Sequence, residues 1–361
     1  MRILIDINHP AHVHYFRIYI KIMKKEGHEC CVINRDSKMI NQLLDYYGIK
    51  HTIRNKRPNK KSSLASMMNL ARMIMWCVRK SFAFKPDLYL GFGSSACAVT
   101  SRIFRKPCIL MDDTEHNSMN HRIYYPCCSS VLTPFYFNKK LGNDKDTKQI
   151  TFNAFVEQLY LHSKYYKKDN AVLEELGLQP NNYVLIRYIA YDAHHDIGTK
   201  PLSLDAKRRI VEHLSKHIRV LISLEKSIDD PYLNQFVLKI SPEKMHDLEA
   251  NAKFMITEGA TMASESYVLG VPYIYLNPLR CGNIDYQCGK SPHRAFQSTE
   301  ENEVLAKIDE LLKANIDTEK EKAEVEKDTT NPTDLLIWFV KNYPGSCEIL
   351  KKNPSCQDMF K

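Results

Sequence analysis

Residues 256–265 constrain the fold more than any other stretch of the chain. The segment begins with apolar residues typical of a buried strand, turns through Gly259 and a run of small residues, and continues as a helix. A further apolar run, residues 271–276, predicts the next strand of a parallel sheet. Small residues let the backbone approach a ligand, and the first turn of a helix offers unpaired N–H groups and partial positive charge. The segment is therefore typical of a diphosphate-binding turn, although an ordinary strand–turn–helix unit has the same pattern.

Each residue of this turn has a predicted part in binding. Glu265 lies about two turns into the helix, where we expect it to meet a sugar or ribose hydroxyl. The residues predicted to line the turn itself are Glu258, Gly259, Ala260, Thr261 and Met262.

The start of the chain predicts a second ligand-binding edge. Residues 2–8 read as a strand, 9–14 as a loop, 15–26 as a helix and 30–34 as the next strand, which is the opening of a doubly wound parallel sheet. Such sheets bind ligands at the carboxyl ends of their strands. His9, His12 and His14 are therefore predicted to border a cleft; without a neighbouring cysteine or carboxylate cluster, their spacing does not favour a metal site.

Two further strand ends in the first half carry candidate residues. Residues 86–96 repeat the pattern of a strand followed by glycine and small residues, with Gly91 and Gly93 opening the turn; Gly93 and Ser94 are the candidate binding residues there. The strand 107–111 leads into four ionisable groups within residues 112–116, of which Asp113 and Glu115 are candidate general bases. A solvated helix cap is the alternative reading, and a magnesium site ranks lower because the sequence offers no further obvious oxygen ligands.

The second half repeats this architecture. Residues 182–188 predict a strand, 192–196 a polar loop, 204–216 a helix and 219–223 another strand. Arg187 is placed to hold a phosphate or carboxylate through two hydrogen bonds. His195 and Asp196 are adjacent, as a histidine acid or base and its orienting carboxylate require, although neighbouring loop histidines are often plain surface residues.

The chain of 361 residues is long enough for two domains. We predict an N-terminal Rossmann-like domain over residues 1–165, a C-terminal Rossmann-like domain over 166–330, and a C-terminal helix and tail over 331–361. The tail from Pro344 is expected to be loosely held. The charge-dense residues 318–327 are interpreted as a solvated face.

Composition narrows the function classes. The N-terminus lacks the long apolar run of a signal peptide, which indicates a cytoplasmic location. Eleven cysteines without a CxxC pair predict neither a zinc site nor a disulfide framework. The net charge of +9 is moderate, and the basic cluster at residues 54–61 is short and lacks interleaved aromatics, so nucleic acid is excluded as a partner. No cofactor or metal is indicated.

A methionine-rich segment, residues 64–78, follows that basic cluster and precedes Arg79, Lys80 and Lys85. Asn69 and Arg72 interrupt it, so it is too short and too polar to span a bilayer. One interpretation is a core helix packed on the sheet. The other is a peripheral helix at the inner face of a membrane, because methionine and tryptophan flanked by cations suit an anionic lipid surface.

Taken together, these motifs resemble a family of uncharacterised bacterial and archaeal proteins. That family is similar to the two-domain GT-B glycosyltransferases, such as the MurG enzyme of peptidoglycan synthesis, and to the non-hydrolysing UDP-N-acetylglucosamine 2-epimerases. The resemblance covers nearly the whole chain, to about Tyr343. The motifs that carry it are residues 5–16, 91–94, 112–116, Arg187 with 192–196, and 258–265.

The resemblance implies two Rossmann-like domains facing a cleft. The second domain would hold a nucleotide sugar, most simply a UDP-sugar, with its diphosphate on the helix after Gly259. The acceptor, a lipid-linked or other saccharide, would enter over the first domain near His9, His12 and His14, and Asp113 or Glu115 would act as base. The epimerases usually carry Glu-Ala-Gly where this chain has residues 112–115, which disfavours epimerisation.

We therefore expect a glycosyltransferase that moves a sugar from a nucleoside-diphosphate sugar to a surface-polysaccharide or glycolipid acceptor. The alternatives are an enzyme like the UDP-N-acetylglucosamine 2-epimerases and a non-catalytic nucleotide-sugar-binding protein, because fold does not fix function.

Overall fold

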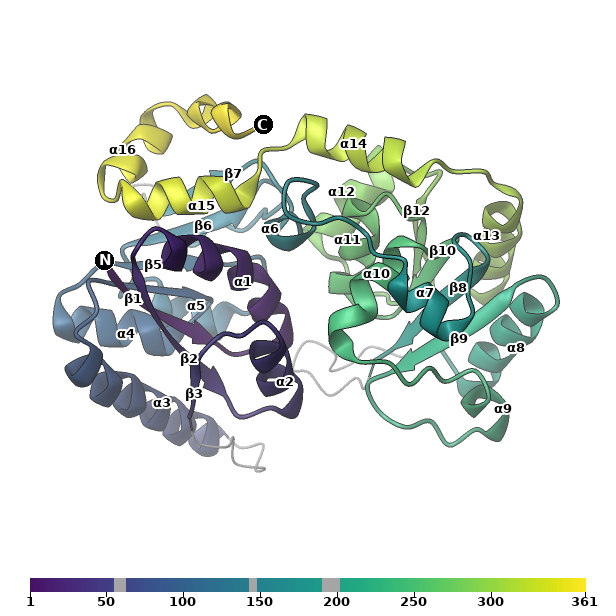
Figure 1. Cartoon of the computed structure of the whole chain (residues 1–361), viewed down its shortest axis with the longest axis horizontal. Helices are drawn as coiled ribbons and strands as arrows, with labels where there is room; N and C mark the ends of the chain where they lie inside the picture. Colours follow the sequence, from purple (N-terminus) through teal and green to yellow (C-terminus); the bar gives the residue numbers. More distant parts are fainter. Residues whose placement is uncertain (55–62, 143–147, 190–201) are drawn as a thin grey trace. The chain divides into compact units, whose positions relative to one another are not determined.

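The computed structural model describes residues 1–54, 63–142, 148–189 and 202–361. The chain forms two compact units (Figure 1). Unit 1 comprises Met1–Tyr160 and Thr329–Lys361, and unit 2 comprises Leu161–Asp328. Each unit contains one parallel sheet with helices around it, which confirms the expected α/β class with two Rossmann-like domains.

Unit 1 is built on a seven-stranded parallel sheet with the order β3-β2-β1-β4-β5-β6-β7. The order reverses direction between β1 and β4, and such switch points are where doubly wound sheets bind ligands. The four-residue strand β7 escaped prediction because its surroundings are polar. The strands are β1 (Arg2–Ile7), β2 (Glu29–Arg35), β3 (His51–Arg54), β4 (Leu88–Phe92), β5 (Cys108–Met111), β6 (Ser130–Pro134) and β7 (Gln149–Phe152).

The first helix of unit 1 corrects the sequence interpretation. Residues 9–14 were predicted as a loop, but α1 (Pro10–Lys25) begins directly after His9. Proline suits the first helical position because its ring fixes φ and no N–H is needed there. The Nδ1 atom of His9 accepts a hydrogen bond from the amide of Ala11 at 3.3 Å and caps the helix. The other helices that precede residue 162 are α2 (Lys38–Tyr46), α3 (Ser63–Phe84), α4 (Ser95–Phe104), α5 (Ser118–Tyr124) and α6 (Gln158–Leu161).

Unit 2 contains a five-stranded parallel sheet with the order β12-β11-β10-β8-β9. Its switch point lies between β8 and β10, which pair directly. The three-residue β12 also escaped prediction, since so short a run has no measurable periodicity. The strands are β8 (Tyr183–Tyr188), β9 (Arg219–Leu224), β10 (Phe254–Thr257), β11 (Tyr273–Tyr275) and β12 (Ala295–Gln297).

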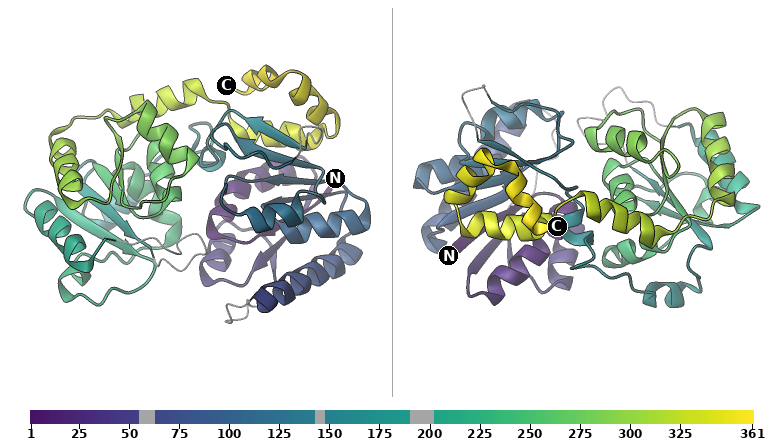
Figure 2. Two further views of the ribbon diagram at one scale, coloured as in Figure 1. Left: turned by 180° about the vertical axis from the view of Figure 1, so that it is seen from behind. Right: turned by 90° about the horizontal axis from the view of Figure 1, so that it is seen from above.

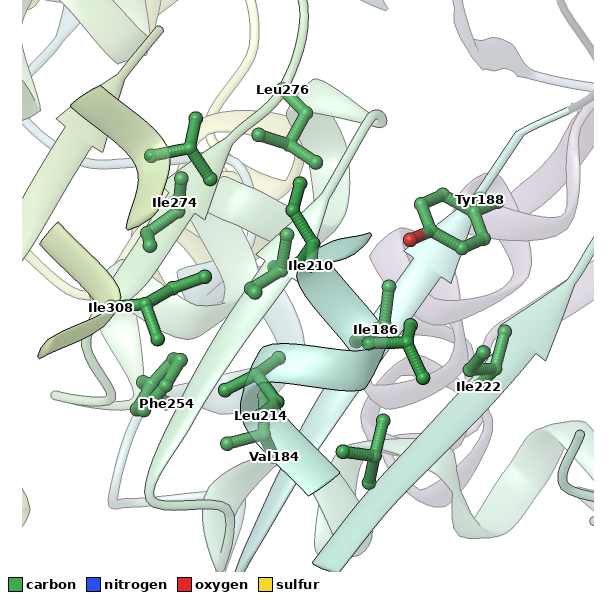
Figure 3. Packing of buried hydrophobic residues seen from close by; sticks show 14 of the residues in the cluster. Val184, Ile186, Tyr188, Ile210, Leu214, Ile222, Phe254, Ile274, Leu276 and Ile308 are labelled. Carbon is green, nitrogen blue, oxygen red and sulfur yellow. The ribbon is translucent and has the colours of Figure 1, made fainter. Parts of the chain in front are cut away.

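The core of unit 2 lies between this sheet and the helices α8 (Leu204–Ser215) and α13 (Glu301–Lys313). Figure 3 shows Ile210 and Leu214 of α8 and Ile308 of α13 among the strand residues Val184, Ile186 and Ile274. Burial of these aliphatic side chains holds β8 and β10 rigidly at the centre of the unit. The remaining helices are α7 (Ala171–Leu176), α9 (Pro231–Asn234), η2 (Pro242–Lys244), α10 (Met245–Ala250), α11 (Ala260–Val268), α12 (Gly282–Lys290) and α14 (Thr318–Asp328).

The C-terminal segment returns to unit 1 as α15 (Pro332–Lys341), α16 (Gly345–Lys352) and η3 (Pro354–Phe360) (Figure 2). The expectation of a loosely held tail from Pro344 is wrong. The side chain of Gln357 accepts a hydrogen bond from the amide of Asn153 at 2.7 Å, and the amide of Asn331 donates to the carbonyl of Phe360 at 2.8 Å. The charge-dense residues 318–327 form most of α14, which is mainly solvated but buries Lys322 and Val325.

We predict that Gly270→Ala destabilises unit 2 by about 3 kcal/mol or more. Gly270 has a φ of +78°, and an added Cβ would lie 2.0 Å from the carbonyl oxygen of Thr318, so α14 has to move. Gly289→Ala is the matched control, because a Cβ there meets nothing within 4 Å. Urea unfolding of both variants is the measurement, and an equal effect of the two substitutions would contradict the packing of α14 against this turn.

Candidate active site

The carboxyl ends of three neighbouring strands bring most first-half candidates to one edge of unit 1. β1, β4 and β5 are adjacent in the sheet. Their ends lead into Asn8, Ser94 and Asp113 respectively. Because all three strands run in the same direction, these loops lie at the ligand-binding edge, at the switch point.

Asp6 at the end of β1 organises this edge, and the sequence interpretation missed it. Its side chain is fully buried. It accepts hydrogen bonds from the Oγ of Ser94 at 2.5 Å and the Nδ2 of Asn8 at 2.8 Å, and it forms an ion pair with Arg54 at 3.2 Å. Ser94 also caps α4 by accepting from the amide of Cys97. The predicted binding residue Ser94 is therefore held rigidly by a carboxylate and a helix start.

A second buried carboxylate, Asp112, holds the turn after β5. It accepts hydrogen bonds from the hydroxyl of Tyr124 at 2.5 Å and the amide of Thr114 at 2.8 Å, and His121 lies 3.3 Å away. Gly93 is predicted as a binding residue and has a φ of +51°; a Cβ there would lie 3.6 Å from Asp112. The positive φ favours glycine at this turn, and a Cβ would also crowd the side chain of Asn120 at 3.3 Å.

Asp113 is the titratable group of this edge best suited to proton transfer. Burial, the neighbouring carboxylate of Asp112 and the charge of Glu115 together raise the pKa of Asp113 to about 7, against an opposing hydrogen bond from Thr114. A carboxyl group with this pKa is present in both protonation states near neutral pH and can accept a proton there. Glu115, the other candidate base, accepts a hydrogen bond from the amide of Asn138 instead.

The three N-terminal histidines have different environments. His9 caps α1. His12 lies in the first turn of the helix, and the centroid of its ring is 5.0 Å from that of Phe92. Burial, then the positive charges of His9 and Arg54, lower the pKa of His12 well below its usual range, so its ring is neutral near pH 7. His14 is buried on another side of α1, with its ring 5.3 Å from that of Tyr160.

In unit 2, Gly259 stands between the end of β10 and the start of α11. It is the N-cap of the helix and its amide donates to the Oγ1 of Thr257 at 3.0 Å. Because glycine has no capping side chain, the amides of the first helical turn are left to water or a ligand. Those amides belong to Ala260, Thr261 and Met262, which are partly exposed.

Glu258 is fully buried in this turn. Its carboxylate accepts a hydrogen bond from the amide of Ile189 at 3.0 Å and contacts the ammonium of Lys207 at 2.6 Å. The side chain of Asn277 donates to the carbonyl of Glu258 at 3.1 Å. The side chain of Glu258 therefore joins the ends of β8 and β10 and the helix α8, and Lys207 and Asn277 are site-forming residues that the sequence interpretation missed.

Arg187 and Glu265 each have a partner within unit 2. The guanidinium of Arg187, at the end of β8, donates to the Oγ of Ser223 at 2.7 Å and to the carboxylate of Glu225 at 3.0 Å. Glu265 is buried and lies 3.1 Å from the Nε2 of His246. His195 and Asp196, the predicted acid–base pair, lie outside the described residues. Within the described ranges, His, Cys, Asp and Glu side chains form no group of three or more that could hold a metal ion.

Residues 1–345 match the model of the family described as "Protein of unknown function (DUF354)". The chain belongs to this family. An uncharacterised protein of Methanocaldococcus jannaschii is 25% identical over 348 residues, which cover 94% of this chain and 97% of that protein. The family expected from the motifs is thus confirmed.

Solved structures share the fold at low sequence identity. A Listeria monocytogenes protein assigned provisionally as a UDP-N-acetylglucosamine 2-epimerase matches with a TM-score of 0.68 and 15% identity over 95% of this chain and 96% of that one. The Neisseria meningitidis UDP-GlcNAc 2-epimerase, bound to UDP-GlcNAc, matches with a TM-score of 0.63 and 13% identity over 92% of this chain and 96% of that one. A glycosyltransferase of kitacinnamycin matches with a TM-score of 0.61 and 12% identity over 93% of this chain and 98% of that one. The fold of this chain is the GT-B fold.

We predict that the Asp113 carboxyl lowers stability as the pH rises from about 4 to about 7. Its folded-state pKa of about 7 exceeds the ordinary value of 3.8, so the folded state keeps a proton that the unfolded state has already lost. Asp113→Asn should therefore gain thermal stability relative to the natural chain at pH 8 but not at pH 4. Asp205→Asn, at an exposed position in α8, should show no such pH dependence. Equal differences at both pH values would refute the raised pKa.

Proposed function

We propose that this protein is a glycosyltransferase that moves a sugar from a nucleoside-diphosphate sugar to a surface-polysaccharide or glycolipid acceptor at the inner face of a membrane. The observation that carries the proposal is Asp113, which follows β5 at the carboxyl edge of unit 1 and whose pKa is raised to about 7. The proposal assigns the acceptor and the base to unit 1 and the donor to unit 2.

The donor assignment rests on the turn at Gly259. The amides of Ala260, Thr261 and Met262 in the first turn of α11, together with the helix dipole, suit a diphosphate. Arg187 would add a cation, in exchange for its present partner Glu225. Glu258 positions this turn through its buried contacts, and Glu265 with His246 would meet a sugar or ribose hydroxyl from the same helix. Several solved proteins with this fold are bound to UDP or UDP-GlcNAc, so we propose a UDP-sugar as donor.

In the proposed reaction, the Asp113 carboxylate takes the proton of an acceptor hydroxyl. The hydroxyl oxygen forms a bond with the anomeric carbon of the donor while the bond from that carbon to the diphosphate oxygen breaks. The electron pair of that bond stays on the diphosphate, whose charge the first turn of α11 would stabilise. The neutral His12 would offer a hydrogen bond to the acceptor, and His9 borders it at the start of α1. Ser94 is buried and its hydroxyl donates a hydrogen bond to Asp6, so we assign it to positioning the turn after β4.

Epimerisation at C2 of a UDP-sugar is the second candidate, because several of the solved structures with this fold are UDP-GlcNAc 2-epimerases. The segment Asp112–Glu115 is the observation against it. In this chain the carboxylate of Asp112 is occupied by hydrogen bonds from Tyr124 and Thr114. The proposed base is the next residue, Asp113.

We predict that UDP-sugars raise the melting temperature selectively in a panel of UDP, GDP, CMP, dTDP and their sugars. A ligand at about 100 times its dissociation constant adds about 2.7 kcal/mol to the stability of the folded state. Gly259→Val should abolish this shift, because its side chain occupies the mouth of α11. A Cβ at Gly259 would lie 3.4 Å from Ile189 and 3.7 Å from Thr257, in ordinary contact, and thermal unfolding without nucleotide checks that the larger valine is accommodated.

The matched control for donor binding is Gly289→Ala, which should keep the full shift. A shift that survives Gly259→Val would show that the donor binds elsewhere. The absence of a shift with every nucleotide would overturn the assignment of a nucleotide-sugar donor.

We predict that Asp113→Asn lowers the rate of acceptor-dependent UDP release by about 10²–10⁴-fold, the usual contribution of a general base, while the UDP-sugar still raises the melting temperature. The rate of the natural enzyme should rise with pH through about 7. Incubation of enzyme and UDP-sugar in D₂O, followed by mass spectrometry of the sugar, separates the two candidates. Incorporation of deuterium at a sugar carbon in the absence of acceptor would establish epimerisation and refute the transferase proposal.

A further inference from the structure

The helices α3 and α4 of unit 1 form a surface that the proposed reaction does not use (Figure 1). The two helices pack against each other, and near their ends the rings of Phe82 and Phe104 meet at 5.0 Å between centroids. On the inner side of α3, Cys77 and Ser81 are fully buried. The packed-helix interpretation of this segment therefore holds for one side of α3 only.

The outer side of α3 alternates apolar and cationic residues. Met68, Arg72, Met75, Arg79 and Phe82 follow one another at intervals of four and three residues, which places them in a single row along the helix. Met68 is 47% exposed, Met75 63% and Phe82 67%. Both arginines of the row are exposed as well. We call this row, with Arg102 and Ile103 of α4, the α3–α4 face.

The two helices carry charge of one sign. Neither α3 nor α4 contains an aspartate or glutamate. Exposed cations continue beyond the C-terminal ends of the two helices, at Lys85, Arg105 and Lys106. Cations near a helix C-terminus stabilise the helix dipole, which accounts for the residues at these ends. That effect does not account for Arg72 and Arg79, which lie in the interior of α3 between exposed methionines.

An exposed row of large apolar side chains indicates a binding surface. A second copy of this chain would bring the same cations against each other, which opposes self-association through this face. Nucleic acid would match the cations but not the intervening methionines and phenylalanine. An anionic bilayer matches both, because its headgroups attract cations and its acyl boundary accepts apolar side chains.

We propose that the α3–α4 face binds the surface of an anionic lipid bilayer. Met68, Met75 and Phe82 enter the boundary between headgroups and acyl chains, and Arg72 and Arg79 contact lipid phosphates. The helix lies on the bilayer: among the described residues, no helix is long and apolar enough to cross it. This face supplies the membrane contact that a glycolipid acceptor requires, but it is inferred from α3 and α4 alone.

Sedimentation of the full chain with vesicles tests the inference. Binding is measured to phosphatidylcholine vesicles with and without about one third phosphatidylglycerol, an anionic lipid. We expect binding only to the anionic vesicles. Arg72→Gln with Arg79→Gln should weaken it about thirtyfold, since each cation near an anionic surface contributes about fivefold. Met75→Ser with Phe82→Ser should weaken it at unchanged charge.

The matched control is Lys216→Gln with Lys320→Gln, which removes two charges from exposed positions of unit 2 and should leave binding unchanged. Thermal unfolding confirms that each variant is folded. Equal binding to both vesicle types would overturn the proposal. So would a loss of vesicle binding in the control variant equal to that in the double arginine variant. If the natural chain is a dimer and the variant Met75→Ser with Phe82→Ser is a monomer, the α3–α4 face binds a second copy of the chain instead. Vesicle binding needs no nucleotide sugar, so its outcome is independent of the proposed reaction.

Discussion

Buried carboxylates at the carboxyl ends of parallel strands determine the geometry of both units. Asp6, Asp112 and Glu258 are each almost fully buried at such an end. Each accepts hydrogen bonds from neighbouring loops and helices, and Asp6 and Glu258 also pair with Arg54 and Lys207. Removing one partner of a buried ion pair leaves an uncompensated charge, at a cost of about 3–5 kcal/mol. The loops that carry Ser94, Asp113 and Gly259 are therefore tied to buried carboxylates whose partners cannot be removed without a large cost.

The contrast between Asp112 and Asp113 follows from this arrangement. Asp112 receives donors from Tyr124 and Thr114, which compensate its burial. Burial and the neighbouring acidic groups Asp112 and Glu115 raise the pKa of Asp113 to about 7, against the hydrogen bond from the hydroxyl of Thr114 and a backbone hydrogen bond. Adjacent residues thus differ: Asp112 holds the turn through its hydrogen bonds, whereas Asp113, with its raised pKa, is the group proposed to exchange a proton near neutral pH.

The sequence was sufficient to predict most of the parallel strands and the residues that follow them, but not the short β7 and β12. Apolar runs ending in Gly93 or Gly259 identify strand ends, and strand ends are where these folds bind ligands. The partners of the buried carboxylates could not be predicted, because Arg54 and Lys207 lie far along the chain from Asp6 and Glu258 and only the sheet order brings them together. The start of α1 was missed because three histidines suggested a polar loop, whereas Pro10 favours a first helical turn.

The helix α4 connects the two proposed functions of unit 1. Its first residues follow Ser94, which binds Asp6 at the carboxyl edge of the sheet, and its last residues include Arg102 and Ile103 of the α3–α4 face. Ten residues of helix span about 15 Å, so Ser94 at one end of α4 and the exposed residues Arg102 and Ile103 at the other lie about that far apart. The helix α3 ends at Phe84, just before β4 begins, so Phe82 lies near the amino edge of the sheet and Met68 lies nearer the carboxyl edge. The proposed bilayer contact therefore extends along unit 1 toward the edge that carries the proposed base.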